Sequence, residues 1–136
     1  MLDAISIEAL PGGRALISWF GQILSFHDAE IVNLSLDRSA SSILTIYCFR
    51  MTDEVDTRGY FIPDKHALVT FQMDDIIDLK LDGFSVQNVI FGLTISKRPD
   101  SDPGYDIDLE PCFGLSGRLS CRSLSVLFRP LDGPLR

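Results

Sequence analysis

The chain has 136 residues, of which 46% are hydrophobic and 23% charged, a composition typical of one folded domain. Nineteen Asp and Glu residues against twelve Lys and Arg residues give a formal net charge of −7, which opposes binding to nucleic acid or to an anionic membrane. The N-terminal sequence does not follow the pattern of a secretory signal, and no apolar run approaches the ~18 residues of a membrane span. We therefore expect residues 1–136 to form one cytoplasmic domain.

The first predicted element is a helix over residues 11–20, followed by Gly21 as a stop. Pro11 suits the first turn of a helix. Four apolar residues recur at helical spacing: Leu16, Trp19, Phe20 and Ile23. Such a stripe predicts packing against a sheet. Trp19 and Phe20 are alternatively an exposed aromatic anchor for a partner.

From Glu30 onward, apolar and polar residues alternate with a period of two, which indicates half-buried β-strands. The strands are expected near residues 30–36, 43–51, 67–73, 77–81, 89–95, 105–109 and 119–128. The side chains expected to face the core are Val32, Leu34, Leu36, Val69, Phe71, Leu79, Phe91, Leu93, Ile107 and Val126. The apolar phase changes between Arg122 and Ser123, which predicts a bulge or bend that curves the sheet.

These elements predict an α+β fold, predominantly antiparallel β, with one N-terminal helix packed on a curved sheet. Its form is expected to be a sandwich or a partly open barrel. Residues 130–136 are expected to be a tail. The two longest connections are Thr52–Asp64 and Lys97–Gly104, and the first is a natural place for function.

Three cysteines are present, Cys48, Cys112 and Cys121, widely spaced and without a CxxC pair. This spacing does not indicate a zinc site. We expect free, structurally dispensable thiols in a reducing compartment.

The segment FHDAE, at residues 26–30, contains His27, Asp28 and Glu30, residue types that bind metals or transfer protons. In an extended segment, Asp28 and Glu30 point to one face and His27 to the other, whereas a turn at Asp28 would let them converge. A metal-dependent enzyme using these residues and His66 is therefore one hypothesis. We favour a structural role, in which Asp28 accepts hydrogen bonds from backbone amides and His27 bridges to a carbonyl or carboxylate.

The acidic run from Asp100 to Glu110 suggests a calcium loop, but Tyr105 stands where an EF-hand requires glycine and Pro111 where it requires glutamate. Its carboxylates are therefore predicted to form a solvated strand face: Asp106, Asp108 and Glu110. The sequence contains no GxGxxG, P-loop, GxSxG or HExxH motif, so we expect no cofactor.

Three stretches carry a family resemblance: WFGQILSFHDAEIVNLSLDR at residues 19–38, DLKLDGFSVQNVIFGLTI at 78–95 and GLSGRLSCRSLSVLF at 114–128. They resemble the immunity protein 50 family and related bacterial proteins. The resemblance implies an intracellular inhibitor that neutralises a toxin by binding it, without catalysis. It assigns no functional residues.

Our first functional hypothesis is therefore a non-catalytic immunity protein whose acidic surface engages a basic toxin domain. The candidate partner-binding residues are Trp19, His27, Asp28, Glu30, Asp106, Asp108 and Glu110. The alternative is a binding module that holds a small ligand or peptide in the curved sheet, in a pocket lined by Phe71, Phe91 and Tyr105. The sequence specifies no oligomeric state.

Overall fold

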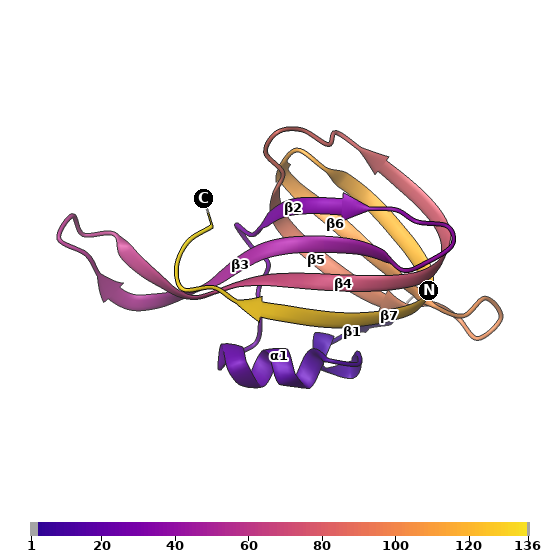
Figure 1. Cartoon of the computed structure of the whole chain (residues 1–136), viewed down its shortest axis with the longest axis horizontal. Helices are drawn as coiled ribbons and strands as arrows, with labels where there is room; N and C mark the ends of the chain where they lie inside the picture. The colour runs from indigo at the N-terminus through magenta and orange to yellow at the C-terminus, as the bar shows by residue number, and fades with distance from the viewer. Residues whose placement is uncertain (1–2, 136) are drawn as a thin grey trace.

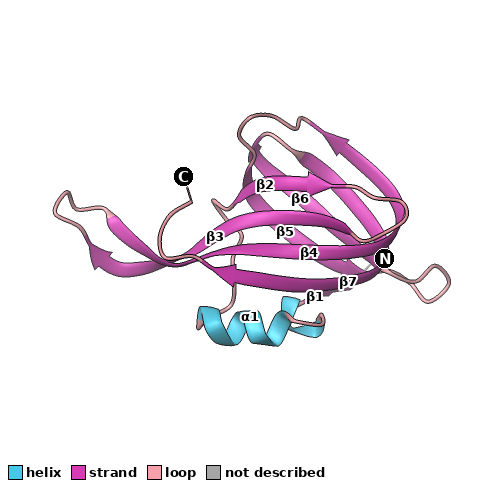
Figure 2. Cartoon of the chain, viewed as in Figure 1, coloured by secondary structure: helices cyan, strands magenta, loops and turns pink. Residues whose placement is uncertain are grey.

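The computed structural model describes residues 3–135. The chain begins with β1 (Asp3–Ile5), a short 3-10 helix, η1 (Ile7–Ala9), and the helix α1 (Gly13–Phe20). Six strands follow: β2 (Glu30–Ser35), β3 (Ser42–Val55), β4 (Phe61–Asp82), β5 (Val89–Lys97), β6 (Tyr105–Phe113) and β7 (Ser116–Pro130). The strand pairs in this part of the chain are antiparallel. The expected α+β, mainly antiparallel fold is confirmed (Figure 2).

The sheet closes on itself in a ring. Its strand order is β1-β5-β2-β3-β4-β7-β6, and β6 pairs back with β5. The seam between β2 and β5 is short, with Glu30 opposite Val89 as its register pair. Two backbone bonds join it, from the Ile31 amide to the Asn88 carbonyl oxygen and from the Ile90 amide to the Ala29 carbonyl oxygen (2.8 Å each). Of the two expected forms, the ring therefore corresponds to the partly open barrel rather than to two stacked sheets (Figure 1).

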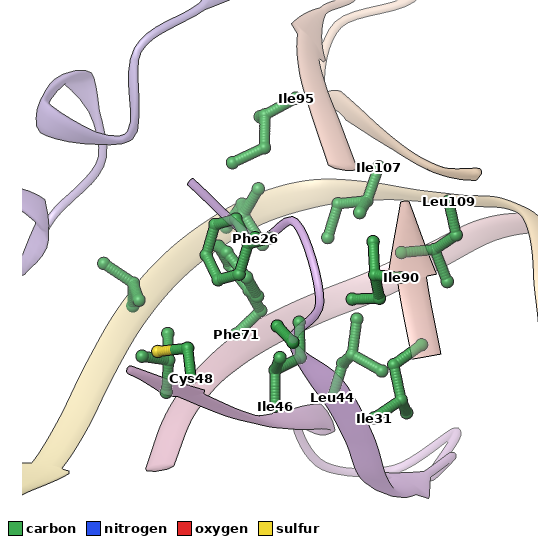
Figure 3. Packing of buried hydrophobic residues seen from close by; sticks show 14 of the residues in the cluster. Phe26, Ile31, Leu44, Ile46, Cys48, Phe71, Ile90, Ile95, Ile107 and Leu109 are labelled. Atoms are coloured by element: carbon green, nitrogen blue, oxygen red, sulfur yellow. The ribbon is translucent and has the colours of Figure 1, made fainter. Parts of the chain in front are cut away.

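The core lies inside this ring. Of the side chains expected there, Val69, Phe71, Ile107 and Val126 are fully buried. Leu79 and Leu93 are partly buried and pack against the same cluster. Figure 3 shows this packing, with the Phe26 ring next to that of Phe71.

The helix α1 lies beside β7 (Figure 1). It begins two residues later than expected, at Gly13, and ends at Gly21 as predicted. The amide of Val126 in β7 donates to the Pro11 carbonyl oxygen (2.9 Å), which brings the start of the helix against this strand. Leu16 and Phe20 are buried. Ile23 is 81% exposed, because the helix has ended before it and it leaves the apolar stripe.

Two strands depart from the expected phase. In β2, Ile31 is buried and Val32 is exposed, and the register with β3 shifts between Ile31 and Asn33. Leu34, after the shift, is partly buried against the core as expected, whereas Leu36 lies just past the strand and is exposed. In β5, Ile90 is buried and Phe91 is 53% exposed, next to two further register shifts. Each shift moves the alternation by one residue, so side chains expected inside point outward.

The expected loop Thr52–Asp64 is instead the end of a β-hairpin formed by β3 and β4. The turn forms around Asp56, whose Oδ1 accepts from the amides of Arg58 (2.8 Å) and Tyr60 (3.0 Å). The strands near residues 67–73 and 77–81 are parts of the single long strand β4.

The expected change of phase in β7 is confirmed. Cys121 and Leu124 are both buried, and the two residues between them, Arg122 and Ser123, are exposed. Opposite this point in β4, Asp75 has a left-handed backbone (φ 56°), and the register shifts between Ile76 and Asp78. The bend is therefore shared by the two strands.

The tail after β7 is partly held in place, because the Leu131 amide donates to the His66 carbonyl oxygen (2.8 Å). Arg136, the last residue of the expected tail, lies outside the described residues, as do the first two residues of the expected domain.

Candidate partner-binding site

The FHDAE segment forms a tight turn between α1 and β2. Phe26 and Ala29 are buried, whereas the side chains of His27 and Asp28 are 52% and 61% exposed. The Ala29 amide donates to the Phe26 carbonyl oxygen (2.9 Å), and Asp28 adopts a left-handed backbone (φ 67°). The buried Phe26 packs on Phe71, with ring centroids 5.9 Å apart. The turn therefore fixes two core side chains and presents two polar ones to solvent.

Asp28 and His27 support this turn in different ways. The Asp28 amide donates to the Ile90 carbonyl oxygen (2.9 Å), which ties the turn to β5. The expected hydrogen bonds from backbone amides to the Asp28 carboxylate are not found in the described part of the chain; Asp28 contributes through its backbone, because aspartate tolerates the left-handed conformation better than most residues. His27 Nδ1 lies 3.2 Å from the Phe91 carbonyl oxygen, and its ring meets Phe91 edge-on, as expected for a histidine that bridges to a carbonyl.

His27 and Asp28 also line a surface hollow of about 300 Å³. Its walls come from the end of α1, from the turn and from β3: Phe20, Ser25, His27, Asp28, Phe49 and Met51. The Nε2 atom of His27 lies 3.7 Å from Asp28 Oδ2, so the two polar side chains stand together on one wall. We call this the basal hollow, because it lies at the base of the hairpin described next.

The β3–β4 hairpin extends beyond the ring. The ladder between β3 and β2 ends at Tyr47, and the ladder between β4 and β7 ends at Ala67. Past these points the two strands pair with each other, through Arg50 with Asp64 and Val55 with Phe61. Figure 1 shows this projection, which we call the projecting hairpin, residues 50–64.

Large apolar side chains are exposed on the projecting hairpin. They are Met51 (52%), Val55 (54%), Tyr60 (67%), Phe61 (60%) and Ile62 (38%). Exposed apolar side chains gathered on one short segment in this way are typical of interaction surfaces in soluble proteins. The sequence indicated this segment as a natural place for function but none of these side chains in particular. The signal that could have identified them is the apolar run Tyr60–Ile62, which directly follows a turn containing Asp and Gly.

The base of the projecting hairpin is tied to α1. Arg50 donates through Nε and Nη2 to the two carboxylate oxygens of Asp64 (2.8 and 2.7 Å) and through Nη1 to the Phe20 carbonyl oxygen (3.1 Å). These hydrogen bonds hold the pKa of the Asp64 carboxyl below its ordinary value. Next to this pair, Lys65 Nζ lies 5.0 Å from the centre of the Trp19 ring.

Trp19 is half-buried. Its ring packs against Phe128, with centroids 5.3 Å apart, and against Phe20 at 6.4 Å. Most of the side chain therefore belongs to the contact between α1 and β7, and its exposed part stands beside the hairpin base. Glu30 lies at the β2–β5 seam, paired with Val89 and Tyr47, and is partly buried.

The acidic candidates on β6 lie in a different environment from the one expected. Asp106 is fully buried rather than solvated. It accepts from Arg98 Nη1 (2.9 Å) and Ser120 Oγ (2.6 Å), because the β5–β6 connection folds back and places Arg98 over it. Asp108 pairs with Arg118 (2.7 Å), and Glu110 is exposed as predicted. A direct contact between Asp106 and a partner is therefore excluded by its burial.

The β5–β6 connection is held by further ion pairs. Asp102 accepts from Arg122 Nη1 (2.6 Å) and Arg98 Nη2 (2.5 Å), and both bonds lower the pKa of its carboxyl. Arg118 Nη1 lies 3.7 Å from the second oxygen of Asp106. The cluster therefore neutralises itself internally.

The four residues of the metal hypothesis do not form one group, although His27 and Asp28 lie close together. His66 is buried. Its Nδ1 atom lies 2.7 Å from the Tyr47 hydroxyl oxygen, and the two rings are stacked. Among residues 3–135, no group of three or more His, Cys, Asp or Glu side chains is arranged to hold a metal ion.

The residues of the ligand-pocket hypothesis do not line one cavity either, since Phe71 is inside the core and Phe91 is half exposed. A hollow of about 370 Å³ lies elsewhere, between β2, the end of β4 and the residues just before β7. Its lining residues include Leu34, Leu81, Phe84 and Leu115.

The thiols of Cys48, Cys112 and Cys121 are free. Burial raises the pKa of Cys48 and Cys121 to about 12, whereas Cys112 is exposed. For the part of the chain that is described, none of the helices has the length and apolar character needed to cross a membrane.

The chain was compared with protein-family models, with curated proteins and with solved structures. No family model, curated protein or solved structure matches it. The candidate site is therefore defined by its own geometry and charge.

Proposed function

We propose that this chain is a non-catalytic, cytoplasmic protein-binding domain that acts as a bacterial immunity protein and neutralises a toxin by direct binding. The observation that carries the proposal is the excess of negative charge outside the described ion pairs. Among the described residues, ion pairs with arginine involve four aspartates. The four arginines are Arg50, Arg98, Arg118 and Arg122. These pairs are neutral together, so the formal charge of −7 belongs to the remaining surface.

An uncompensated acidic surface accelerates association with a basic partner and selects against acidic ones. The exposed apolar side chains of the projecting hairpin add the desolvation energy that charge alone does not provide. The resemblance of residues 19–38, 78–95 and 114–128 to immunity proteins supports the same function. The free thiols are compatible with a reducing compartment and support the cytoplasmic location.

Co-expression tests this proposal. The chain is expressed in bacteria together with a candidate toxin domain, chosen from the genes that neighbour its own. We expect the chain to restore growth and to purify as a complex with that domain. Growth arrest in the presence of abundant, folded chain, with no complex formed, would contradict the proposed function.

A second candidate function is the binding of a small apolar ligand or peptide in the hollow lined by Leu34, Leu81 and Phe84. The observation that favours it is the volume of about 370 Å³, within the ~300–1,000 Å³ of ligand pockets. Titration with the neutral dye Nile red tests it. Saturable one-to-one binding that Leu81→Asp abolishes would support this function, and weak, non-saturable binding unaffected by the substitution would argue against it.

A further inference from the structure

The projecting hairpin exposes large apolar side chains, although the same two strands bury such side chains where they belong to the ring. Elsewhere in β3 and β4, large apolar side chains such as Leu44, Ile46 and Phe71 are fully enclosed. A two-stranded ribbon without a covering layer is marginally stable in water and offers its edges to other chains. The apolar side chains of the hairpin therefore add little to the stability of the isolated protein, and a partner that covers them would gain the energy of their burial.

The projecting hairpin is nevertheless held in one conformation. Asp56 closes the turn with two side-chain hydrogen bonds, and Arg50 ties the opposite end to Asp64 and to the last turn of α1. A surface that is already ordered loses less conformational entropy on association. The hairpin thus has the properties of a preformed docking element.

Charge distinguishes between two possible occupants. Residues 51–63 contain Asp53, Glu54 and Asp56 but only one basic residue, Arg58. Asp28 adds an exposed carboxylate in the basal hollow. A second copy of this chain would bring a formal charge of −7 against the same acidic surface, whereas a basic protein would be attracted to it.

We propose that the projecting hairpin and the basal hollow form one docking surface, and that its partner is a protein with basic residues around an apolar pocket. Tyr60 and Phe61 enter the pocket of the partner, while the acidic residues of the hairpin face its basic rim. In the basal hollow, Met51 and the exposed edge of His27 receive the partner's side chains. This inference rests on the proposed function and specifies where the toxin domain binds.

Matched variants test the docking surface. Phe61→Ser removes an exposed aromatic from the hairpin, and Phe113→Ser removes one of similar exposure (60% and 49%) from the end of β6. Glu54→Lys reverses a charge on the hairpin, and Glu8→Lys reverses one on the 3-10 helix before α1. The probe is a catalytically inactive form of the candidate toxin domain from the co-expression test, and its dissociation constant is measured by calorimetry with each full-length variant.

We expect Phe61→Ser and Glu54→Lys to weaken binding by about tenfold or more, as for central interface residues, and the two controls to stay within about twofold. The loss for Glu54→Lys should shrink when NaCl rises from about 50 to about 200 mM, because salt screens exposed charges. Circular dichroism melts of all four variants identify any loss of folding. Since the altered side chains are exposed, unchanged melts are expected.

Two other outcomes are distinguishable. If the unaltered chain binds the toxin domain but both hairpin variants bind equally well, the docking surface is wrong and the proposed function stands. If the unaltered, folded chain does not bind the toxin domain, the proposed function fails and the docking surface fails with it.

Discussion

The contact between the start of α1 and β7 gives a stability prediction whose size follows from the structure. Gly12 has a left-handed backbone (φ 86°), and a Cβ added there would lie 1.9 Å from the Val126 carbonyl oxygen. For an L-residue the left-handed conformation costs about 1–2 kcal/mol. Relief of the overlap requires the Pro11–Val126 bond to lengthen or break, which costs a further ~0.5–1.5 kcal/mol. Gly12→Ala should therefore lower the free energy of unfolding by about 1.5–3.5 kcal/mol.

Urea unfolding followed by circular dichroism measures this loss. Gly133→Ala is the matched control, because a Cβ at Gly133 meets no atom within 4 Å. We expect the control to change the free energy of unfolding by less than about 0.5 kcal/mol, in either direction. A Gly12→Ala variant as stable as the unaltered chain, or an equal loss for both variants, would refute the close packing of this helix start on β7.

Three further predictions concern the core, the FHDAE turn and the thiols. Phe71→Ala should lower the free energy of unfolding by ~3–5 kcal/mol in the same urea assay, because it empties a fully buried site beside Phe26; a loss below about 1 kcal/mol would show that the ring core is not packed this way. Asp28→Ala should lower the free energy of unfolding by ~1–2 kcal/mol and Asp28→Gly by much less, since the turn needs a residue that adopts the left-handed backbone and not a carboxylate. Equal losses for the two variants would show that the carboxylate itself stabilises the turn. A maleimide reagent at neutral pH should modify Cys112 in the folded chain, and Cys48 and Cys121 only after unfolding, because burial raises their pKa to about 12. Mass spectrometry of the labelled peptides checks this, and rapid labelling of all three would contradict the burial.

Local sequence was sufficient to predict the elements whose patterns are regular. The alternation from Ala67 to Met73 gives a strand with Val69 and Phe71 inside, and the structure buries both. Gly21 ends α1 in the left-handed conformation that glycine adopts without strain. The phase change between Arg122 and Ser123 also appears as predicted. In each case the physical cause is local: backbone conformation and a period of two or 3.6 residues.

Local sequence failed where a strand carries an extra residue. Val32 and Phe91 have the alternation of buried residues, yet register shifts in β2 and β5 turn them outward. Such a shift is set by the pairing strand, which lies far away in the sequence. Composition alone also made the Thr52–Asp64 segment resemble a loop, whereas pairing across the Asp56 turn extends both strands.

For the candidate site, the sequence determined the residue types and the tertiary structure decided their environment. The carboxylates of Asp28 and Asp106 are equally polar in sequence; folding exposes the first in the basal hollow and buries the second under Arg98. The apolar run Tyr60–Ile62 resembles a core strand in sequence, and it is exposed because the ladders with β2 and β7 stop short of the hairpin. Burial depends on which distant segments cover a side chain, and that is a property of the closed ring rather than of any local pattern.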